Sequence, residues 1–215
     1  MLRYTNEAQR SMSNIRRFKT FVKKILSFVY LDREICIDRC DLTYFLVRPE
    51  EFHSDVECHL IKEDDIPRLA SDLGVRMAES AKSKLGLGYG FAAVENGKIV
   101  GYTWFLTQRC RREGEYPFYY EIFPKEKSVY ISGSYVVPKK RNRAIARKVL
   151  ASALNQMKAM GYESAFTTWD KKNLAVRPTL NRFGFKYIGS ICYRRIMGIS
   201  YRDMRNLKQV SRICE

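Results

Sequence analysis

The sequence predicts an α/β or α+β fold built around a mixed sheet. Two observations favour this class: a hairpin signal in mid-chain, and an alternation of strands and helices that is confined to the second half. Hydrophobic residues make up 46% and aromatic residues 13% of the 215 residues, which is enough apolar material for a sizeable core. This composition excludes a disordered chain.

The first predicted element is a helix over residues 12–30. Its apolar side chains recur at steps of three and four residues, the period of one helix face; they are Met12, Ile15, Phe18, Phe21, Val22, Ile25, Leu26 and Val29. Basic side chains occupy much of the remaining surface. The pattern fits an amphipathic helix packed on the domain, and it also fits a helix that lies on an anionic membrane surface.

Four further elements precede the hairpin. Residues 33–48 alternate in part between apolar and polar and are predicted to be extended, and residues 56–61 form a strand. A helix over residues 64–73 starts at an acidic pair and a proline. A second helix over residues 77–85 ends at a glycine-rich stretch.

The clearest hairpin joins residues 91–94 to residues 99–106. An Asn-Gly pair lies between these two apolar runs, which is a strong hairpin signal. Residues 107–127 are polar, charged and aromatic, and we interpret them as a long loop with room for a short strand at 118–122. A loop of this length over a site would be a natural substrate gate.

The second half alternates strands and helices and ends in a strand pair. The predicted elements are a strand at 129–137, a helix at 142–160, a strand at 163–169, a helix at 173–183, and strands at 185–193 and 194–199. We therefore divide the chain into a basic amphipathic helix with an extended segment (residues 1–55), a main domain (residues 56–199) and a basic C-terminal tail (residues 200–215).

Charge and cysteine content indicate the partners and the compartment. A net charge of +16 suggests an anionic partner such as coenzyme A, nucleic acid or an acidic membrane surface. A zinc site could be built from Cys36, Cys40, Cys58 and His59, but the tight paired spacing typical of structural zinc sites is absent. We therefore interpret the cysteines as buried thiols and expect no metal. No signal peptide and no apolar run of ~20 residues is present, so we expect a cytoplasmic protein.

The most informative stretch is residues 135–146, YVVPKKRNRAIA. A strand stops at Pro138, a short basic loop follows, and a helix begins with small residues. The first N–H groups of a helix have no internal partner and the helix dipole is positive there, so this arrangement suits an anion. Arg141 and Arg143 add positive charge. Taken alone, the pattern also fits a plain strand–helix connection with solvated basic residues.

These residues resemble the GNAT superfamily, the acetyl-CoA-dependent N-acetyltransferases, whose fourth strand leads into a segment of the type V-x-P-x-x-R-G-x-G-I-G/A. The residues in register are Val136, Pro138, Arg141, Ala144, Ile145 and Ala146. The resemblance implies that the coenzyme A pyrophosphate is held by the amides of Asn142, Arg143, Ala144, Ile145 and Ala146. It implies that the main chain of Val136 and Val137 pairs with the pantetheine arm. It also implies a GNAT-like, mostly antiparallel mixed sheet flanked by helices, with an N-terminal helix and strand extension.

A second segment, residues 173–185, is similar to the superfamily's N-x-x-[AS]-x-x-x-Y-x-K-x-G-F pattern. Asn173, Arg182, Gly184 and Phe185 match it, and by resemblance Asn173 and Arg182 belong to the coenzyme A site. Leu180 stands where a tyrosine often protonates the departing thiolate, and leucine cannot donate a proton.

The catalytic base is not where the resemblance would place it. Family members often have an acidic residue five positions before the proline, and here that position is Gly133. The remaining candidates are Glu121, in an aromatic segment, Tyr135, on the strand before the basic loop, and Asp170, which follows a strand on the cleft side. Each also has an ordinary structural role open to it: a surface carboxylate, core packing and a helix cap, respectively.

The resemblance implies transfer of an acetyl or other acyl group from acyl-CoA to an amine by direct attack in a ternary complex. Two alternatives stay open: a long-chain N-acyltransferase that uses an acidic acyl-carrier protein, and a non-catalytic CoA-binding relative. The dispersed basic residues disfavour a nucleic-acid-binding module. The basic N-terminal region allows peripheral attachment to the anionic inner membrane.

Overall fold

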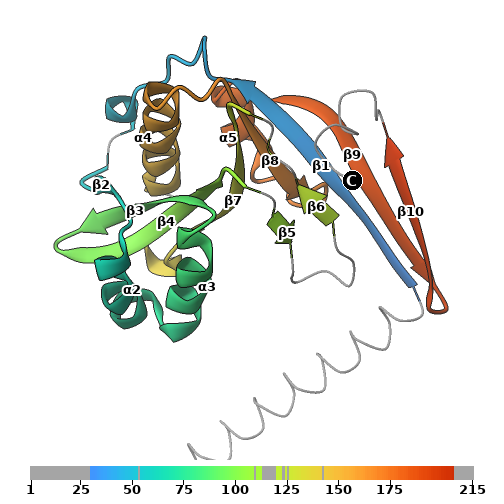
Figure 1. The fold of residues 1–215 in the computed structure, drawn as a ribbon, viewed down its shortest axis with the longest axis horizontal. Coiled ribbons are helices and arrows are strands. Elements are labelled where there is room, and N and C mark those ends of the chain that lie inside the picture. The colour runs from blue at the N-terminus through green and yellow to red at the C-terminus, as the bar shows by residue number, and fades with distance from the viewer. Residues whose placement is uncertain are drawn as a thin grey trace, which may run out of the picture.

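The computed structural model describes residues 30–52, 54–108, 110–112, 120–122, 124, 126–141 and 143–205. Helices and strands follow one another along the chain as drawn in Figure 1. The strands are β1 (Tyr30–Asp41), β2 (Glu57–Leu60), β3 (Gly88–Glu95), β4 (Lys98–Leu106), β5 (Cys110–Arg112), β6 (Tyr120–Ile122), β7 (Ser128–Val136), β8 (Ser164–Asp170), β9 (Lys186–Ile196) and β10 (Ile199–Arg205). The α-helices are α2 (Ile66–Leu73), α3 (Val75–Leu85), α4 (Ile145–Ala159) and α5 (Arg177–Arg182).

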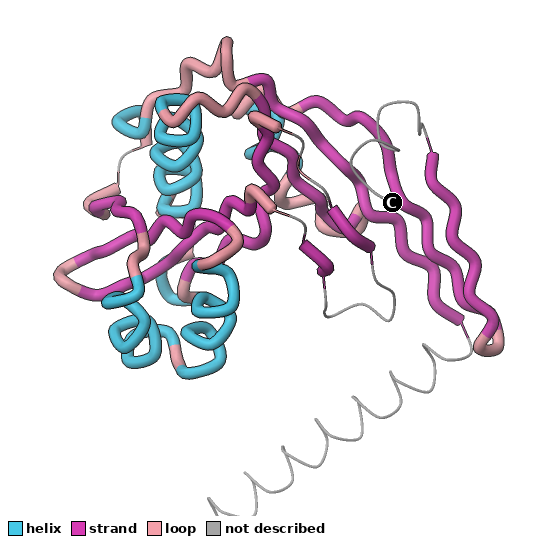
Figure 2. Tube along the Cα trace, viewed as in Figure 1, coloured by secondary structure: helices cyan, strands magenta, loops and turns pink. Residues whose placement is uncertain are grey.

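Eight strands form one sheet in the order β10-β9-β1-β8-β7-β4-β3-β2. Within the described chain, β7 and β8 are the only parallel neighbours in this sheet, and β5 pairs with β6 separately. The predicted fold class, a mixed and mostly antiparallel sheet flanked by helices, is therefore confirmed. Figure 2 shows the helices gathered around β2, β3, β4 and β7, while the long strands β1, β9 and β10 extend beyond them.

Each face of the sheet has its own core. One cluster joins α4, α5 and strands β1, β7 and β8 through side chains such as Leu154, Val129 and Trp169. A second joins α2 and α3 to β3 and β4 around Leu69 and the fully buried Trp104. Apolar side chains on both faces explain why β3 and β4 are largely hydrophobic in the sequence.

β7 and β8 pair only over their first residues. The parallel ladder runs from the Ser128–Ser164 pair to the Ile131–Thr167 pair. Beyond it, β7 stays with β4 as far as Val136, whereas β8 follows β1 to Asp170. Gly133 has φ +93°, and the register between β4 and β7 shifts beside it, which is the signature of a β-bulge. The two strands therefore separate after Ile131, and in the described part of the chain no strand pairs with this edge of β7.

β1 comes from the segment that we assigned to an N-terminal extension, yet it lies inside the sheet between β8 and β9. The segment that follows also packs on the domain: the rings of Phe45 and Phe52 stack on Phe183 with centroid separations of 6.1 and 5.6 Å. The boundary drawn at residue 55 is therefore not a boundary of the sheet or of its core.

Other element limits differ from the prediction. β1 ends at Asp41, although extended structure was expected to residue 48. α4 starts at Ile145, later than expected, because a short 3-10 segment and a turn precede it. α5 starts at Arg177, also later than expected, because a turn around Asn173 precedes it. Residues 199–205, assigned in part to a basic tail, form the edge strand β10. The helix predicted over residues 12–30 lies outside the described residues except for Tyr30, which is the first residue of β1.

The Asn96-Gly97 hairpin is confirmed. Both residues have positive φ, 49° and 74°, as a two-residue turn of the primed type requires, and β3 pairs with β4 on either side. The loop predicted over 107–127 includes the two short strands β5 and β6, the second of which overlaps the expected strand at 118–122. None of the described helices is long and apolar enough to cross a membrane.

The cysteines considered for a zinc site do not meet. Cys36 and Cys40 lie on β1, whereas Cys58 and His59 lie on β2, and four strands separate β1 from β2. Burial raises the pKa of both β1 thiols to about 11, and Cys40 Sγ donates a hydrogen bond to the Phe183 carbonyl at 3.2 Å. At neutral pH these two side chains are therefore protonated thiols inside the core.

Candidate functional site

A cavity of about 570 Å³ opens where β7 and β8 separate. Its walls come from the free part of β7, the start of α4 and the segment that leads into α5. The lining residues are Ile131, Ser134, Tyr135, Val136, Lys140, Arg141, Ala144, Ile145, Ala146, Arg147, Leu150, Thr167, Asn173, Ala175, Val176, Thr179 and Leu180. The cavity therefore joins the splayed edge of the sheet to the positive end of a helix.

The start of α4 presents unpaired backbone N–H groups. Ala144 has φ 58° and ψ 2°, which is left-handed backbone, and its carbonyl accepts the first helical bond from Lys148 N–H at 2.9 Å. Within the described part of the chain, the N–H groups of Ile145, Ala146 and Arg147 have no hydrogen-bond acceptor. A left-handed residue followed by helical ones points successive N–H groups into one concavity, which is a typical anion site.

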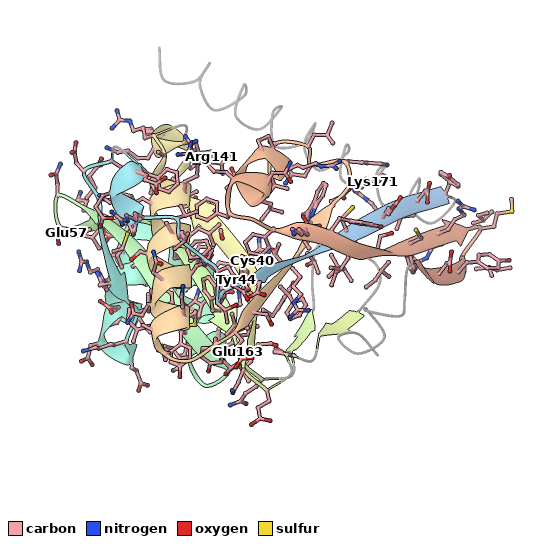
Figure 3. All side chains as sticks on the ribbon, turned by 90° about the horizontal axis from the view of Figure 1, so that it is seen from above. Cys40, Tyr44, Glu57, Arg141, Glu163 and Lys171 are labelled. Carbon is pink, nitrogen blue, oxygen red and sulfur yellow. The ribbon has the colours of Figure 1, made fainter. Side chains whose placement is uncertain are left out.

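Basic side chains surround this helix start, and some already have partners. Arg141 donates from Nε to the Val136 carbonyl at 3.2 Å and lies beside α4 (Figure 3). Lys140 forms an ion pair with Glu95 of the β3–β4 hairpin, and Arg143 Nη1 lies 3.8 Å from the same carboxylate. Arg147 lies over the Phe52 ring, with 5.7 Å from the guanidinium carbon to the centroid. One carboxylate thus offsets only part of the local positive charge.

Most of the residues predicted to bind coenzyme A meet at the cavity. Val136, Arg141, Ala144, Ile145, Ala146 and Asn173 all line it. Arg143 lies at the helix start beside Glu95 and is not part of the wall. Asn142 lies outside the described residues.

Val137 and Arg182 are placed elsewhere. The Val137 N–H donates to the Val100 carbonyl of β4 at 2.9 Å, and its carbonyl accepts from Lys140 N–H at 2.9 Å, so its main chain is engaged within the protein. Arg182 stacks on Phe52 at 4.9 Å, lies 3.7 Å from the Glu51 carboxylate and is not among the residues that line the cavity. Neither residue faces the cavity in this structure.

A model of the acetyltransferase (GNAT) family matches residues 52–185, which is more than half of the chain. The chain belongs to the GNAT family. No curated protein gives a significant match. The family assignment therefore rests on the family model, and the solved structures below agree with it at the level of fold.

Solved structures share the GNAT fold at low sequence identity. A glucosamine N-acetyltransferase region of a fungal multi-domain β-N-acetylglucosaminidase aligns with TM-score 0.57 at 17% identity, over 87% of this chain and 22% of that one. A Drosophila protein aligns with TM-score 0.52 at 10% identity, over 84% and 58%. A conserved Staphylococcus epidermidis protein of unknown function aligns with TM-score 0.50 at 14% identity, over 81% and 65%. This GNAT chain thus spans less than two thirds of each of these proteins.

The three catalytic candidates occupy different places in the GNAT fold. Tyr135 lines the cavity and stacks on Tyr102 with a centroid separation of 5.8 Å. Asp170 does not line it: one carboxylate oxygen is 2.6 Å from Arg33 Nη1 and the other accepts from Lys172 N–H at 2.8 Å. Asp170 therefore holds the turn after β8. Glu121 lies on β6 opposite Arg111, and the structure does not describe its side chain.

No carboxylate is among the described residues that line the cavity. Gly133 occupies the bulge, where its φ of +93° would strain any residue with a side chain, so a glutamate there would conflict with the local backbone. Leu180 is 4% exposed and lines the cavity, so its apolar side chain stands where a proton donor would be useful. Thr167 and Thr179, which the sequence did not single out, line the same wall. Ser134, a strand hydroxyl that the sequence offers for orienting water, also lines it, and its Oγ is 2.8 Å from Thr103 Oγ1.

The left-handed backbone at Ala144 has a measurable consequence. An alanine in this conformation costs about 1–2 kcal/mol, part of which glycine recovers. We expect Ala144→Gly to raise the free energy of unfolding by up to ~1 kcal/mol, or a few degrees in Tm, and to leave the cavity intact. Thermal unfolding measures this change. A lower Tm would show that the residue does not adopt positive φ.

Proposed function

We propose that this GNAT protein transfers an acetyl or other acyl group from acyl-CoA to an amine acceptor by direct attack. The observation that carries the proposal is the cavity, because it connects three free helix amides to an open strand edge. Coenzyme A is a diphosphate on a long pantetheine arm, and these two features suit its two parts. The volume lies within the range of ~300–1,000 Å³ typical of ligand sites.

The helix start would bind the diphosphate. The N–H groups of Ile145, Ala146 and Arg147 can donate to its oxygens, and Arg141 and Arg143 can add charge-assisted hydrogen bonds. Arg141 presently covers the Val136 carbonyl. A bound pantetheine amide would compete for that carbonyl, so Arg141 would be released toward the phosphates as the arm pairs with β7.

The strand edge would align the thioester. Beyond Ile131, no described strand pairs with β7 on the β8 side, so a backbone N–H there can polarise the carbonyl of a thioester laid along it. Acyl transfer then needs an acceptor amine held within attack distance, which supplies much of the rate enhancement. The acceptor must also lose a proton, and Tyr135 and Glu121 remain candidates for that step.

We also propose a cytoplasmic location, with an anionic membrane surface or an acidic carrier protein as possible partners. The described cysteines Cys36, Cys40, Cys58 and Cys192 are free thiols, which agrees with a reducing compartment. The net charge of +16 supports an anionic partner.

A non-catalytic CoA-binding role is the second candidate, and a specific observation favours it: among the described residues, the cavity wall offers no carboxylate, and Leu180 replaces the usual donor. Two measurements separate the possibilities. Calorimetry with coenzyme A tests the site, and release of free thiol from acetyl-CoA in the presence of an amine panel tests catalysis. Binding without thiol release would favour the second role, and no binding would refute both.

A further inference from the structure

Asp38 is a buried carboxylate on the cavity side of the sheet that neither the sequence motifs nor the proposed binding of acyl-CoA uses. It lies on β1 and is 3% exposed. Cys36 and Cys40, which share its side of the strand, belong to the core under α4 and α5 together with Trp169 and Leu180. Asp38 therefore points to the same face of the sheet as the cavity.

Thr167 connects Asp38 to the cavity. The two residues are direct partners in the antiparallel β1–β8 ladder, which places their Cβ atoms about 4.5–5.5 Å apart on one face. Thr167 also pairs with Ile131 in the last rung before β7 and β8 separate, and its side chain lines the cavity. The Thr167 side chain at the start of the splay thus neighbours a carboxyl group on the adjacent strand, and no hydrogen bond joins the two groups in this structure.

Both groups have unused hydrogen-bonding capacity. Among the described residues, Asp38 Oδ1 accepts no hydrogen bond, and the Thr167 hydroxyl makes none. A buried carboxylate oxygen without a donor loses its hydration without compensation and destabilises the fold, so its retention calls for an explanation. The buried Trp169 indole N–H, which also lacks a well-formed hydrogen bond, approaches the carboxylate but does not satisfy Oδ1.

Three titratable or charged groups among the described residues face Asp38. The Arg177 charge of α5 acts on it, Cys36 shares its strand and Tyr187 is its partner on β9. Burial raises the pKa of Asp38 above its ordinary value, and the Trp169 N–H and the Arg177 charge oppose part of this effect. A carboxylate with a raised pKa is a stronger base than one in water.

We propose that Asp38 and Thr167 form a proton relay for acyl transfer, with Thr167 as the group that contacts the reactants and Asp38 as the positioning residue behind it. This inference rests on the proposed function. It accounts for the glycine at the usual base position and for Leu180 at the usual acid position with one pair of residues.

The relay balances without any added reactant. As the amine nitrogen attacks the thioester carbon, the new C–N bond forms and the amine loses a proton to Thr167 Oγ1. The hydroxyl proton of Thr167 passes to the Asp38 carboxylate. When the C–S bond breaks, the sulfur leaves as a thiolate with the bonding electron pair. The same path in reverse returns one proton to the sulfur, which yields the amide, free coenzyme A and an unchanged Asp38.

Asp38→Asn tests the relay, because asparagine keeps the shape but cannot accept a proton. With acetyl-CoA and the fastest amine of a panel, we expect kcat to fall about 100-fold at neutral pH. Calorimetric affinity for coenzyme A should stay unchanged, since Asp38 does not line the cavity. Asp41→Asn on the same strand, where the side chain is exposed, is the matched control and should keep the wild-type kcat.

The pH dependence separates a relay from a structural role. Ionisation of the amine affects wild type and variant equally, so the ratio of their kcat values isolates Asp38. Below the pKa of Asp38 the relay is protonated and cannot accept a proton, so the ratio should approach one; above it the ratio should reach its plateau. A ratio that stays constant across pH would mean that Asp38 only supports the fold, and the relay would be refuted.

Thr167 provides an independent check that does not depend on how Asp38→Asn folds. Thr167→Val removes the hydroxyl at nearly constant volume and should lower kcat by a similar factor, whereas Thr167→Ser should restore it. Wild-type kcat in Thr167→Val would overturn the inference even if Asp38 proved important. If the wild type binds coenzyme A but turns over no amine, the proposed function fails and the relay falls with it.

Stability offers a readout without turnover. A group whose pKa is raised in the folded state stabilises the protein at low pH and loses that contribution as pH rises through the folded value. Asp38→Asn should therefore raise Tm at neutral pH, and the gain should shrink as pH falls. A variant that is less stable than wild type at pH 7 would contradict the picture of an unsatisfied buried carboxylate.

Discussion

Ala144→Asp should abolish coenzyme A binding, with an expected loss of affinity of at least ~100-fold by calorimetry. The substitution places a carboxylate at the helix start that lines the cavity. Two like charges about 4 Å apart repel by about 4 kcal/mol at an effective dielectric constant of 20, which corresponds to roughly 10³ in affinity. The new carboxylate can also accept hydrogen bonds from the free amides itself, so it competes for the donors that the diphosphate needs.

The fold should survive this change, since aspartate tolerates left-handed backbone and favours helix starts. Ala159→Asp is the matched control: it makes the same substitution at the exposed last residue of α4, far from the amides. The control should bind coenzyme A as the wild type does. Retained affinity in Ala144→Asp would place the diphosphate elsewhere and would remove the observation on which the proposed function rests.

Local chemistry made part of the site predictable. Pro138 ends a strand and small residues open a helix, so the strand, the basic loop and α4 could be placed from the sequence within three residues. The Asn96-Gly97 turn fixed the hairpin for the same reason, because few residue pairs accept two positive φ angles. The family motif then indicated which of these elements meet at the cavity.

Long-range pairing was not predictable in the same way. β1 lies between β8 and β9. Both strands come from more than a hundred residues further along the chain, and no local pattern encodes the register of β1 with them. β10 was missed because an edge strand needs only one apolar face and its basic residues resembled a solvated tail. Asp38 was missed although its segment was predicted to be extended, since a single carboxylate in a strand acquires meaning only when its neighbour across the ladder is known.

Motif transfer also had a physical limit. Val137 and Arg182 match positions of the family pattern, yet β4 engages the Val137 amide, and Phe52 and Glu51 engage Arg182. In both cases the competing partner comes from a distant part of the chain. A sequence motif predicts the backbone conformation of its segment more reliably than the orientation of a long side chain.

Phe183→Ala should produce the largest loss of stability among the substitutions considered. Phe183 is 1% exposed, and Phe45 and Phe52 stack on its ring at 6.1 and 5.6 Å. Removing a buried aromatic ring costs about 3–5 kcal/mol, because the transfer free energy is lost and a cavity remains. For a domain of this size that corresponds to a fall in Tm of roughly 10 °C.

Chemical denaturation measures this loss, and Tyr44→Ala is its control, because Tyr44 is 81% exposed and belongs to the same segment. We expect the control to change the free energy of unfolding by less than ~0.5 kcal/mol. The comparison decides whether the segment after β1 is part of the GNAT core, as the aromatic stack indicates. A loss below ~1 kcal/mol in Phe183→Ala would mean that residues 42–52 do not pack on α5, since a stacked and fully buried ring cannot be removed at so small a cost.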